Sequence, residues 1–102
     1  MTEIMENGVY TCKDGDRVLL TITALENNTY RAVNTSFDIT AKVEPIDEYT
    51  TRLTCLEHKG RGKDGRYRST KKLVEHNLRW LDYILEEKGF IRRKKISDGR
   101  KF

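Results

Sequence analysis

The chain has 102 residues and a formal net charge of +4, with 36% hydrophobic and 35% charged residues. This length suits a single domain, and no apolar stretch approaches the roughly 18 residues that a bilayer span needs. Several alternating apolar runs exclude a wholly disordered chain. The N-terminal residues lack a signal-peptide pattern, so we expect a cytoplasmic protein with no membrane association.

The basic residues gather in two segments. Residues 59–72 contain seven basic residues and one acid, a local charge of +6, and residues 88–102 have the same count and charge. The remaining residues therefore carry −8. Such segregation predicts a surface that binds a polyanion, and the alternative interpretation is that these segments are merely solvated loops and tails.

Four runs in the first half predict β-strands. The clearest is 36–44, where Phe37, Ile39, Ala41 and Val43 alternate strictly with polar residues, the pattern of a strand with one buried face. Short turn-forming sequences separate the runs, which predicts hairpins and an antiparallel meander. The predicted strands are 9–13, 18–24, 29–34 and 36–44, with turns at 14–15, 26–28 and 34–35.

The segment 45–58 supports two interpretations. Pro45 would suit a first helical turn, and Asp47 and Glu48 would face the positive end of a helix. Three threonines lower helix propensity, however, and favour the extended state. We therefore predict a fifth strand over 49–57, with a helix as the alternative.

The second half predicts a basic loop and one long helix. Three glycines between residues 60 and 65 predict a loop at 59–69. Ser69 or Thr70 would then cap a helix over 70–88, whose apolar stripe consists of Val74, Leu78, Leu81 and Leu85, widened by Leu73 and Ile84.

Gly89 has the features of a left-handed residue that ends this helix, and Phe90 would fold back on Leu85. Residues 90–96 resemble a strand that enters the Asp98-Gly99 turn. The expected fold is one α+β domain over 1–102. Its β-rich half at 1–58 is expected to form a four- or five-stranded antiparallel meander, with a small SH3-like barrel as an alternative form of that sheet. The basic loop, the helix and a basic tail or hairpin at 89–102 follow.

The basic segments predict nucleic-acid binding. Glycines let backbone amides approach phosphates, arginines and lysines supply charge, and Tyr67 offers a stacking surface for a base. The loop lacks the Gly-Lys-Ser/Thr ending of a P-loop. The predicted contacts to DNA or RNA are Arg61, Lys63, Arg66, Tyr67, Arg68, Lys71, Lys72, Arg79, Arg92, Arg93, Lys94 and Lys95. The alternative is a protein–protein interaction module, a small inhibitor or adaptor that docks on an acidic partner through the same surface. Independently of this choice, the short, motif-poor chain would suit a viral or mobile-element gene.

The segment LDYILEEKGFIRRKKISDGRKF, residues 81–102, resembles the end of a winged-helix DNA-binding domain. In that family a recognition helix leads through a glycine and a hydrophobic residue into a basic wing hairpin. The resemblance implies groove contacts from Lys71, Lys72, His76 and Arg79, wing-strand contacts from Arg92, Arg93 and Lys94, and Arg100 at the turn. A β-rich half stands where the family has two further helices.

Other chemistry has less support in the sequence. Cys12, Cys55, His58 and His76 could in principle bind zinc, but only Cys55-x-x-His58 has ligand-like spacing. We therefore expect no metal, no other cofactor and no disulfide. Residues 58, 67, 68, 75 and 76 include groups that small ribonucleases use, yet no spacing joins a base to an acid, so we predict no enzyme. Trp80 and Tyr83 widen the apolar side of the helix, which suggests a cap on the core or a surface for homodimer formation.

Overall fold

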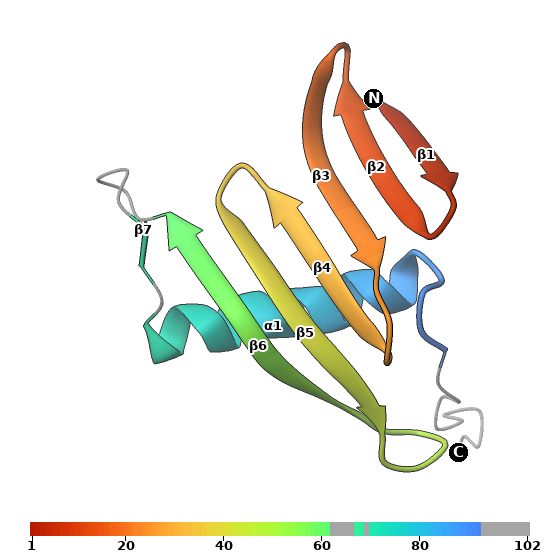
Figure 1. The fold of residues 1–102 in the computed structure, drawn as a ribbon, viewed down its shortest axis with the longest axis vertical. Helices are drawn as coiled ribbons and strands as arrows, with labels where there is room; N and C mark the ends of the chain where they lie inside the picture. Colours follow the sequence, from red (N-terminus) through yellow and green to blue (C-terminus); the bar gives the residue numbers. More distant parts are fainter. Residues whose placement is uncertain (62–66, 69, 93–102) are drawn as a thin grey trace, which may run out of the picture.

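One helix lies across one face of an antiparallel sheet (Figure 1). The computed structural model describes residues 1–61, 67–68 and 70–92, and for residues 61, 67 and 68 only the backbone. The α+β class predicted from the sequence is confirmed. The elements are β1 (Thr2–Glu6), β2 (Val9–Asp14), β3 (Arg17–Ala24), β4 (Thr29–Asn34), β5 (Phe37–Pro45), β6 (Thr51–Arg61), β7 (Tyr67–Arg68) and α1 (Lys71–Glu87).

The strands form a meander in chain order, from β1 at one edge to β7 at the other. The prediction of four or five strands was too low, since the described residues alone form seven, although β7 has only two residues. The sheet is also open rather than closed into a barrel. Within the described ranges every pairing joins neighbours in the sequence, and none joins the two edges.

Strand β1 was not predicted. It pairs antiparallel with β2, and the two are joined by Asn7 and Gly8, whose φ values of 52° and 76° suit a tight hairpin turn. All five of its residues are exposed. Its residues therefore lack the alternation of apolar and polar side chains that identified strand β5.

Strand β6 confirms the predicted fifth strand at 49–57, although it begins at Thr51 rather than at residue 49, and the helical alternative for 45–58 is wrong. The predicted loop at 59–69 is also wrong at both ends, because β6 continues to Arg61 and Tyr67–Arg68 form β7. Gly60 is buried in this strand, opposite Phe37 of β5, and it pairs on its other side with Arg68 of β7. Backbone pairing on both sides holds this glycine extended despite its low strand propensity. The remainder of the predicted loop, 62–66 and 69, lies outside the described residues.

Both ends of α1 follow the predicted capping. Thr70 is the N-cap, and its Oγ1 accepts a hydrogen bond from the Leu73 N–H at 3.2 Å. At the other end Gly89 has φ +83°, and the Phe90 N–H donates to the Leu85 carbonyl at 2.9 Å.

The predicted strand at 90–96 does not begin at Phe90. The N–H groups of Phe90 and Ile91 both donate to the Leu85 carbonyl, and Ile91 is buried against the core. This helix-capping turn keeps residues 90–92 irregular. Residues 93–102, including the predicted Asp98-Gly99 turn, lie outside the described part of the chain.

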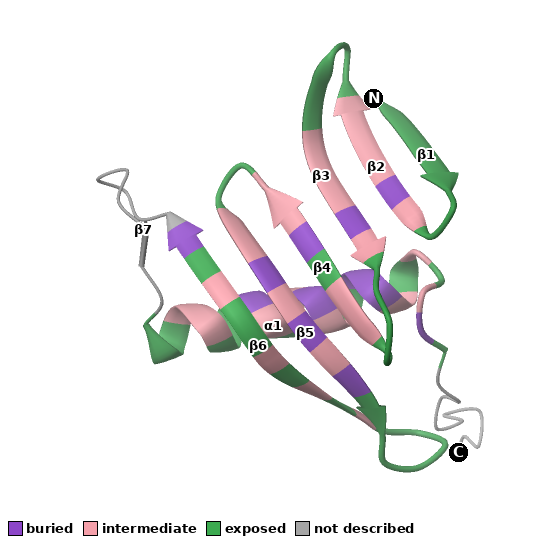
Figure 2. Cartoon of the chain, in the orientation of Figure 1, coloured by how far each residue is buried: buried purple, intermediate pink, exposed green. Residues whose placement is uncertain are grey.

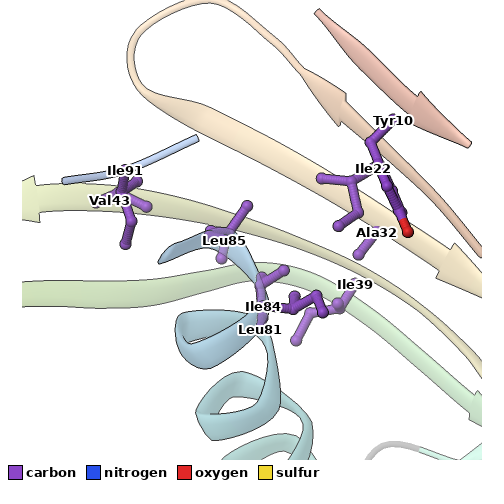
Figure 3. Packing of buried hydrophobic residues seen from close by; sticks show 10 residues of the cluster. Tyr10, Ile22, Ala32, Ile39, Val43, Leu81, Ile84, Leu85 and Ile91 are labelled. Carbon is purple, nitrogen blue, oxygen red and sulfur yellow. The ribbon is translucent and has the colours of Figure 1, made fainter. Parts of the chain in front are cut away.

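The core lies between α1 and the sheet (Figure 3). Its central row runs across directly paired residues of neighbouring strands: Tyr10, Ile22, Ala32 and Ile39. From the helix, Leu81 and Leu85 are fully buried, as the predicted stripe requires, and burial of each such side chain stabilises the fold by about 1.5–3 kcal/mol.

The other face of the sheet has no covering layer in the described structure (Figure 2). It carries polar side chains such as Thr21, Thr23 and Thr40, half-buried along the pleat. Arg31 and Asp38, on neighbouring strands, form a two-pronged ion pair with N–O distances of 3.0 and 2.6 Å. A polar face of this kind is normal for an antiparallel sheet that packs on one side only.

Candidate nucleic-acid interface

Several predicted contact residues come together at the N-terminal end of α1. The β6–β7 pairing places Arg61 opposite Tyr67 and Gly60 opposite Arg68. Two residues after Arg68, Thr70 caps the helix, and Lys71 and Lys72 follow. We call the described part of this region, residues 59–61, 67–68 and 70–72, the basic end.

Lys71 and Lys72 occupy an electrostatically unfavourable place in the helix. Both lie exposed in the first turn, where the backbone dipole is positive, and this turn contains no acid. No ion pair to either lysine occurs among the described residues. The two ammonium groups and the N-terminal backbone N–H groups therefore combine into one site of positive potential.

The rest of the exposed helix face is mixed in charge. Lys72, His76 and Arg79 share the side that points away from the sheet, as expected if they contact a groove. Arg79, however, lies in a shallow depression that Glu75 and Asp82 also line. The last turns of α1 add Glu86 and Glu87 and contain no basic residue, so the positive surface fades along the helix.

Arg92 follows the C-terminal end of α1, whereas the basic end lies at its N-terminal end. The 17 residues of the helix separate the two ends by about 25 Å. The described structure therefore does not join Arg92 to Lys71 and Lys72 in one patch. Of the other predicted contacts, Lys63, Arg66, Arg93, Lys94 and Lys95 lie outside the described residues.

Lys88, counted in the second basic segment, has a structural role. Its Nζ lies 2.7 Å from a Glu3 carboxylate oxygen and 5.1 Å from the centre of the Tyr10 ring. The Tyr10 hydroxyl donates to the same carboxylate. The hydrogen bond from Lys88 lowers the pKa of Glu3 and raises that of Lys88, while burial and the Glu3 contact raise the pKa of Tyr10 to about 12. This cluster attaches β1 to the end of the helix.

Sequence reasoning missed a polar pair inside the helix–sheet interface. Asn77 is only 4% exposed, and its amide nitrogen lies 2.8 Å from His58 Nε2 on β6. Burial lowers the pKa of His58, and the nearby Asp38 carboxylate opposes this shift. The sequence did contain a sign that Asn77 would be buried, because position 77 falls on the same helix face as Leu81 and Leu85. The pair rests on Phe37, whose ring stacks on the imidazole with centroids 6.4 Å apart.

The two cysteines are free thiols. Cys12 is on β2 and Cys55 on β6, four strand spacings or about 19 Å apart, which is too far for a disulfide. In the portion of the chain described here, no three His, Cys, Asp or Glu side chains are grouped as a metal site would require. The same residues include no helix long and apolar enough to cross a bilayer.

Trp80 and Tyr83 do not form one exposed patch. Trp80 is half-buried and packs edge-on against Phe37 with centroids 5.3 Å apart, as expected of a cap on the core. Tyr83 is 63% exposed, and its hydroxyl donates to the Glu87 carboxylate. Formation of a homodimer through this side of the helix stays a prediction.

Comparison with known proteins adds no relative. No protein-family model, no curated protein and no solved structure matches this chain.

Proposed function

We propose that the protein binds nucleic acid through the phosphate backbone, using the basic end. The observation that carries the proposal is the first turn of α1, where Lys71 and Lys72 are exposed with no acid beside them, and the backbone of the β6–β7 pair, with residues 61 and 68, directly precedes it. Exposed cations beside a helix N-terminus suit phosphate contacts, because the backbone N–H groups and the helix dipole there already favour anions. Tyr67 adds a ring on which a base can stack.

The proposed contacts are mainly electrostatic and carry little sequence information. If four to six phosphates are neutralised, the logarithm of the affinity falls with the logarithm of salt concentration at a slope of about −4 to −5 on duplex DNA. Single-stranded RNA would give a shallower slope for the same number of contacts.

Fluorescence anisotropy with labelled duplex DNA and single-stranded RNA, over a series of salt concentrations, tests the proposal. Reversal of two charges in the basic end, Lys71→Glu with Lys72→Glu, is expected to reduce affinity by about 100-fold at low salt and to flatten the slope by about 2. The matched control reverses two lysines of the sheet, Lys13→Glu with Lys42→Glu, which changes the net charge equally. A slope near zero for the natural protein, or equal losses in both double variants, would contradict the proposal.

A winged-helix mode of binding makes a narrower prediction. If α1 enters a DNA groove, Arg79→Glu should weaken binding as much as Lys72→Glu does. If the basic end alone makes the contacts, Arg79→Glu should have a much smaller effect, because Arg79 shares its depression with the acidic residues Glu75 and Asp82.

Docking on an acidic protein would use the same cations. Polyglutamate of matched length therefore serves as a competitor. Nucleic-acid binding predicts that it displaces labelled DNA far less well than unlabelled DNA does, because it offers no phosphates or bases. Equal competition would favour the acidic protein partner.

A further inference from the structure

Strand β1 forms an open edge of the sheet (Figure 1). Within the described ranges it pairs with β2 alone, and all five of its residues are exposed. Edge strands are commonly protected from pairing with another chain by proline, by lysine or by a bulge. The sequence of β1, TEIME, contains no proline and no lysine, and its register with β2 is unbroken. Its free edge is therefore ready to pair with another strand.

The turn between β1 and β2 determines which backbone groups face outward. A two-residue turn at 7–8 joins the strands, so the flanking pair Glu6–Val9 is hydrogen-bonded. Hydrogen-bonded and non-hydrogen-bonded pairs then alternate along the hairpin. The N–H and C=O groups of Glu6 and of every second residue before it therefore point toward β2. Those of Glu3 and Met5 point away from the sheet.

A second copy of β1 matches this edge in one antiparallel register. It places Glu3 opposite the Met5 of the second copy, so that the outward groups of both residues are paired. Ile4 then lies opposite its own counterpart on a two-fold axis. A shift by two residues in one direction would place Glu3 opposite Glu3, where like charges repel. A shift in the other direction would place Glu3 opposite Asn7, in the turn.

This register also brings opposite charges together on the sheet face that α1 does not cover. Glu6 of one copy lies opposite Thr2 of the other, and Thr2 pairs on its far side with Lys13. Paired residues share a face, so the Glu6 carboxylate and the Lys13 ammonium flank the small Thr2 side chain. Neither of them makes an ion pair among the described residues.

The side chains of Glu3 and its neighbours hold β1 in place before any pairing. The Lys88 ammonium lies 2.7 Å from a Glu3 carboxylate oxygen, and the Tyr10 hydroxyl donates to the same oxygen. These contacts lie on the helix side of β1 and leave its backbone edge open. Pairing would therefore require little further ordering of the strand.

We propose that two copies of the chain pair through β1 into a two-fold symmetric dimer with one continuous sheet. The Glu3–Met5 backbone pairs, the contact between the two Ile4 side chains and the Glu6–Lys13 ion pairs hold it together. A junction of two short strands is smaller than a standard interface, so we expect a dissociation constant on the order of 100 µM. The proposal does not rest on nucleic-acid binding, because no proposed nucleic-acid contact lies in β1 or β2.

A charge exchange tests the junction. Glu6→Lys alone and Lys13→Glu alone should each weaken dimer formation by about 10-fold, because symmetry repeats each repulsive pair. The two substitutions together should restore the natural dissociation constant to within about 3-fold. Within one copy the two residues lie about 13 Å apart along the hairpin, so the restoration must arise between copies. Sedimentation equilibrium from about 10 µM to 1 mM measures all four proteins.

Met5→Pro tests the backbone pairing. Proline removes the N–H that faces outward and leaves the hydrogen bonds between β1 and β2 intact, as is tolerated in an edge strand. We expect no dimer at concentrations up to about 1 mM. Met5→Ala is the control, because it shortens the same side chain but keeps the N–H, and it should weaken the dimer by less than about 3-fold.

Three results would each overturn the proposal. They are a natural protein that stays monomeric up to about 1 mM, a double charge variant that associates no better than the single variants, and equal association of Met5→Pro and Met5→Ala. A dimer that none of these substitutions affects would be formed by another surface, such as the Tyr83 side of α1. Dispersed amide spectra for each variant would verify that it remains folded.

Discussion

The two ends of α1 use positive charge in different ways. At the C-terminal end Lys88 contacts Glu3 and the Tyr10 ring, so its cation joins β1 to the helix. At the N-terminal end Lys71 and Lys72 have no ion pair within the described structure, and they lie at the unfavourable pole of the helix dipole. The first arrangement stabilises the fold. The arrangement at the N-terminal end lowers stability slightly, because both lysines oppose the helix dipole.

The core that both ends share should show the largest effect. Leu81→Ala removes a fully buried side chain from the middle of α1 and should lower the free energy of unfolding by about 3 kcal/mol. Leu56→Ala changes the same residue type at a position that is 54% exposed and should cost well under 1 kcal/mol. Urea denaturation measures both. Equal losses would mean that α1 does not anchor the sheet in this way.

The unfavourable lysines give the second prediction, which separates stability from binding. Lys71→Glu with Lys72→Glu places acids in the first helical turn and should raise the free energy of unfolding by roughly 1 kcal/mol, while nucleic-acid affinity falls. Urea denaturation and anisotropy on the same preparations measure the two effects. If the double variant loses both stability and affinity, Lys71 and Lys72 stabilise the helix, and the contrast with Lys88 at its other end disappears.

The cluster around Lys88 predicts how stability depends on pH. Because the folded pKa of Glu3 is lowered, this carboxylate stabilises the fold above its unfolded pKa of about 4.5, and the contribution is lost as pH falls through the folded value. Glu3→Gln should therefore lower the thermal midpoint near neutral pH and should flatten its acid dependence below about pH 4.5. Parallel acid dependence in the two proteins would show that Glu3 does not stabilise the end of the helix.

His58 predicts a smaller effect in a neighbouring pH range. Burial lowers its folded pKa below the unfolded value of 6.5, so the folded state favours the neutral ring. This contribution is fully present above pH 6.5 and is lost as pH falls toward the folded pKa. NMR titration of the imidazole should give a midpoint below 6.5, and Asp38→Asn should lower it further, since that carboxylate raises the pKa. A midpoint above 6.5 would contradict the buried contact with Asn77.

Local patterns predicted much of the fold. Strict alternation identified β5, the Asp14-Gly15 pair marked a turn in which Gly15 has φ +62°, and Gly89 marked the end of the helix. The same approach failed where pairing rather than composition determines the conformation. Gly60 is extended because β5 and β7 bond to it from both sides, and β1 is a strand because β2 pairs with it.

The candidate site was predictable only in part. A count along the chain identified the cations at 59–72, but it could not show that the helix separates Arg92 from them. It also could not distinguish Lys88, which contacts Glu3 from 85 positions away, from an exposed lysine such as Lys72. The role of a charged side chain depends on partners that are distant in sequence.

The chain-order meander has a consequence for folding kinetics. Each strand pairs with its immediate neighbour in the sequence, so every hairpin closes a short loop, and α1 must cross back over strands formed much earlier. Topologies with mostly local pairing fold rapidly. We therefore expect the central hairpins to form before the helix docks, so that core substitutions in α1 mainly accelerate unfolding while those in β4 and β5 slow folding, a difference that stopped-flow chevron plots would reveal.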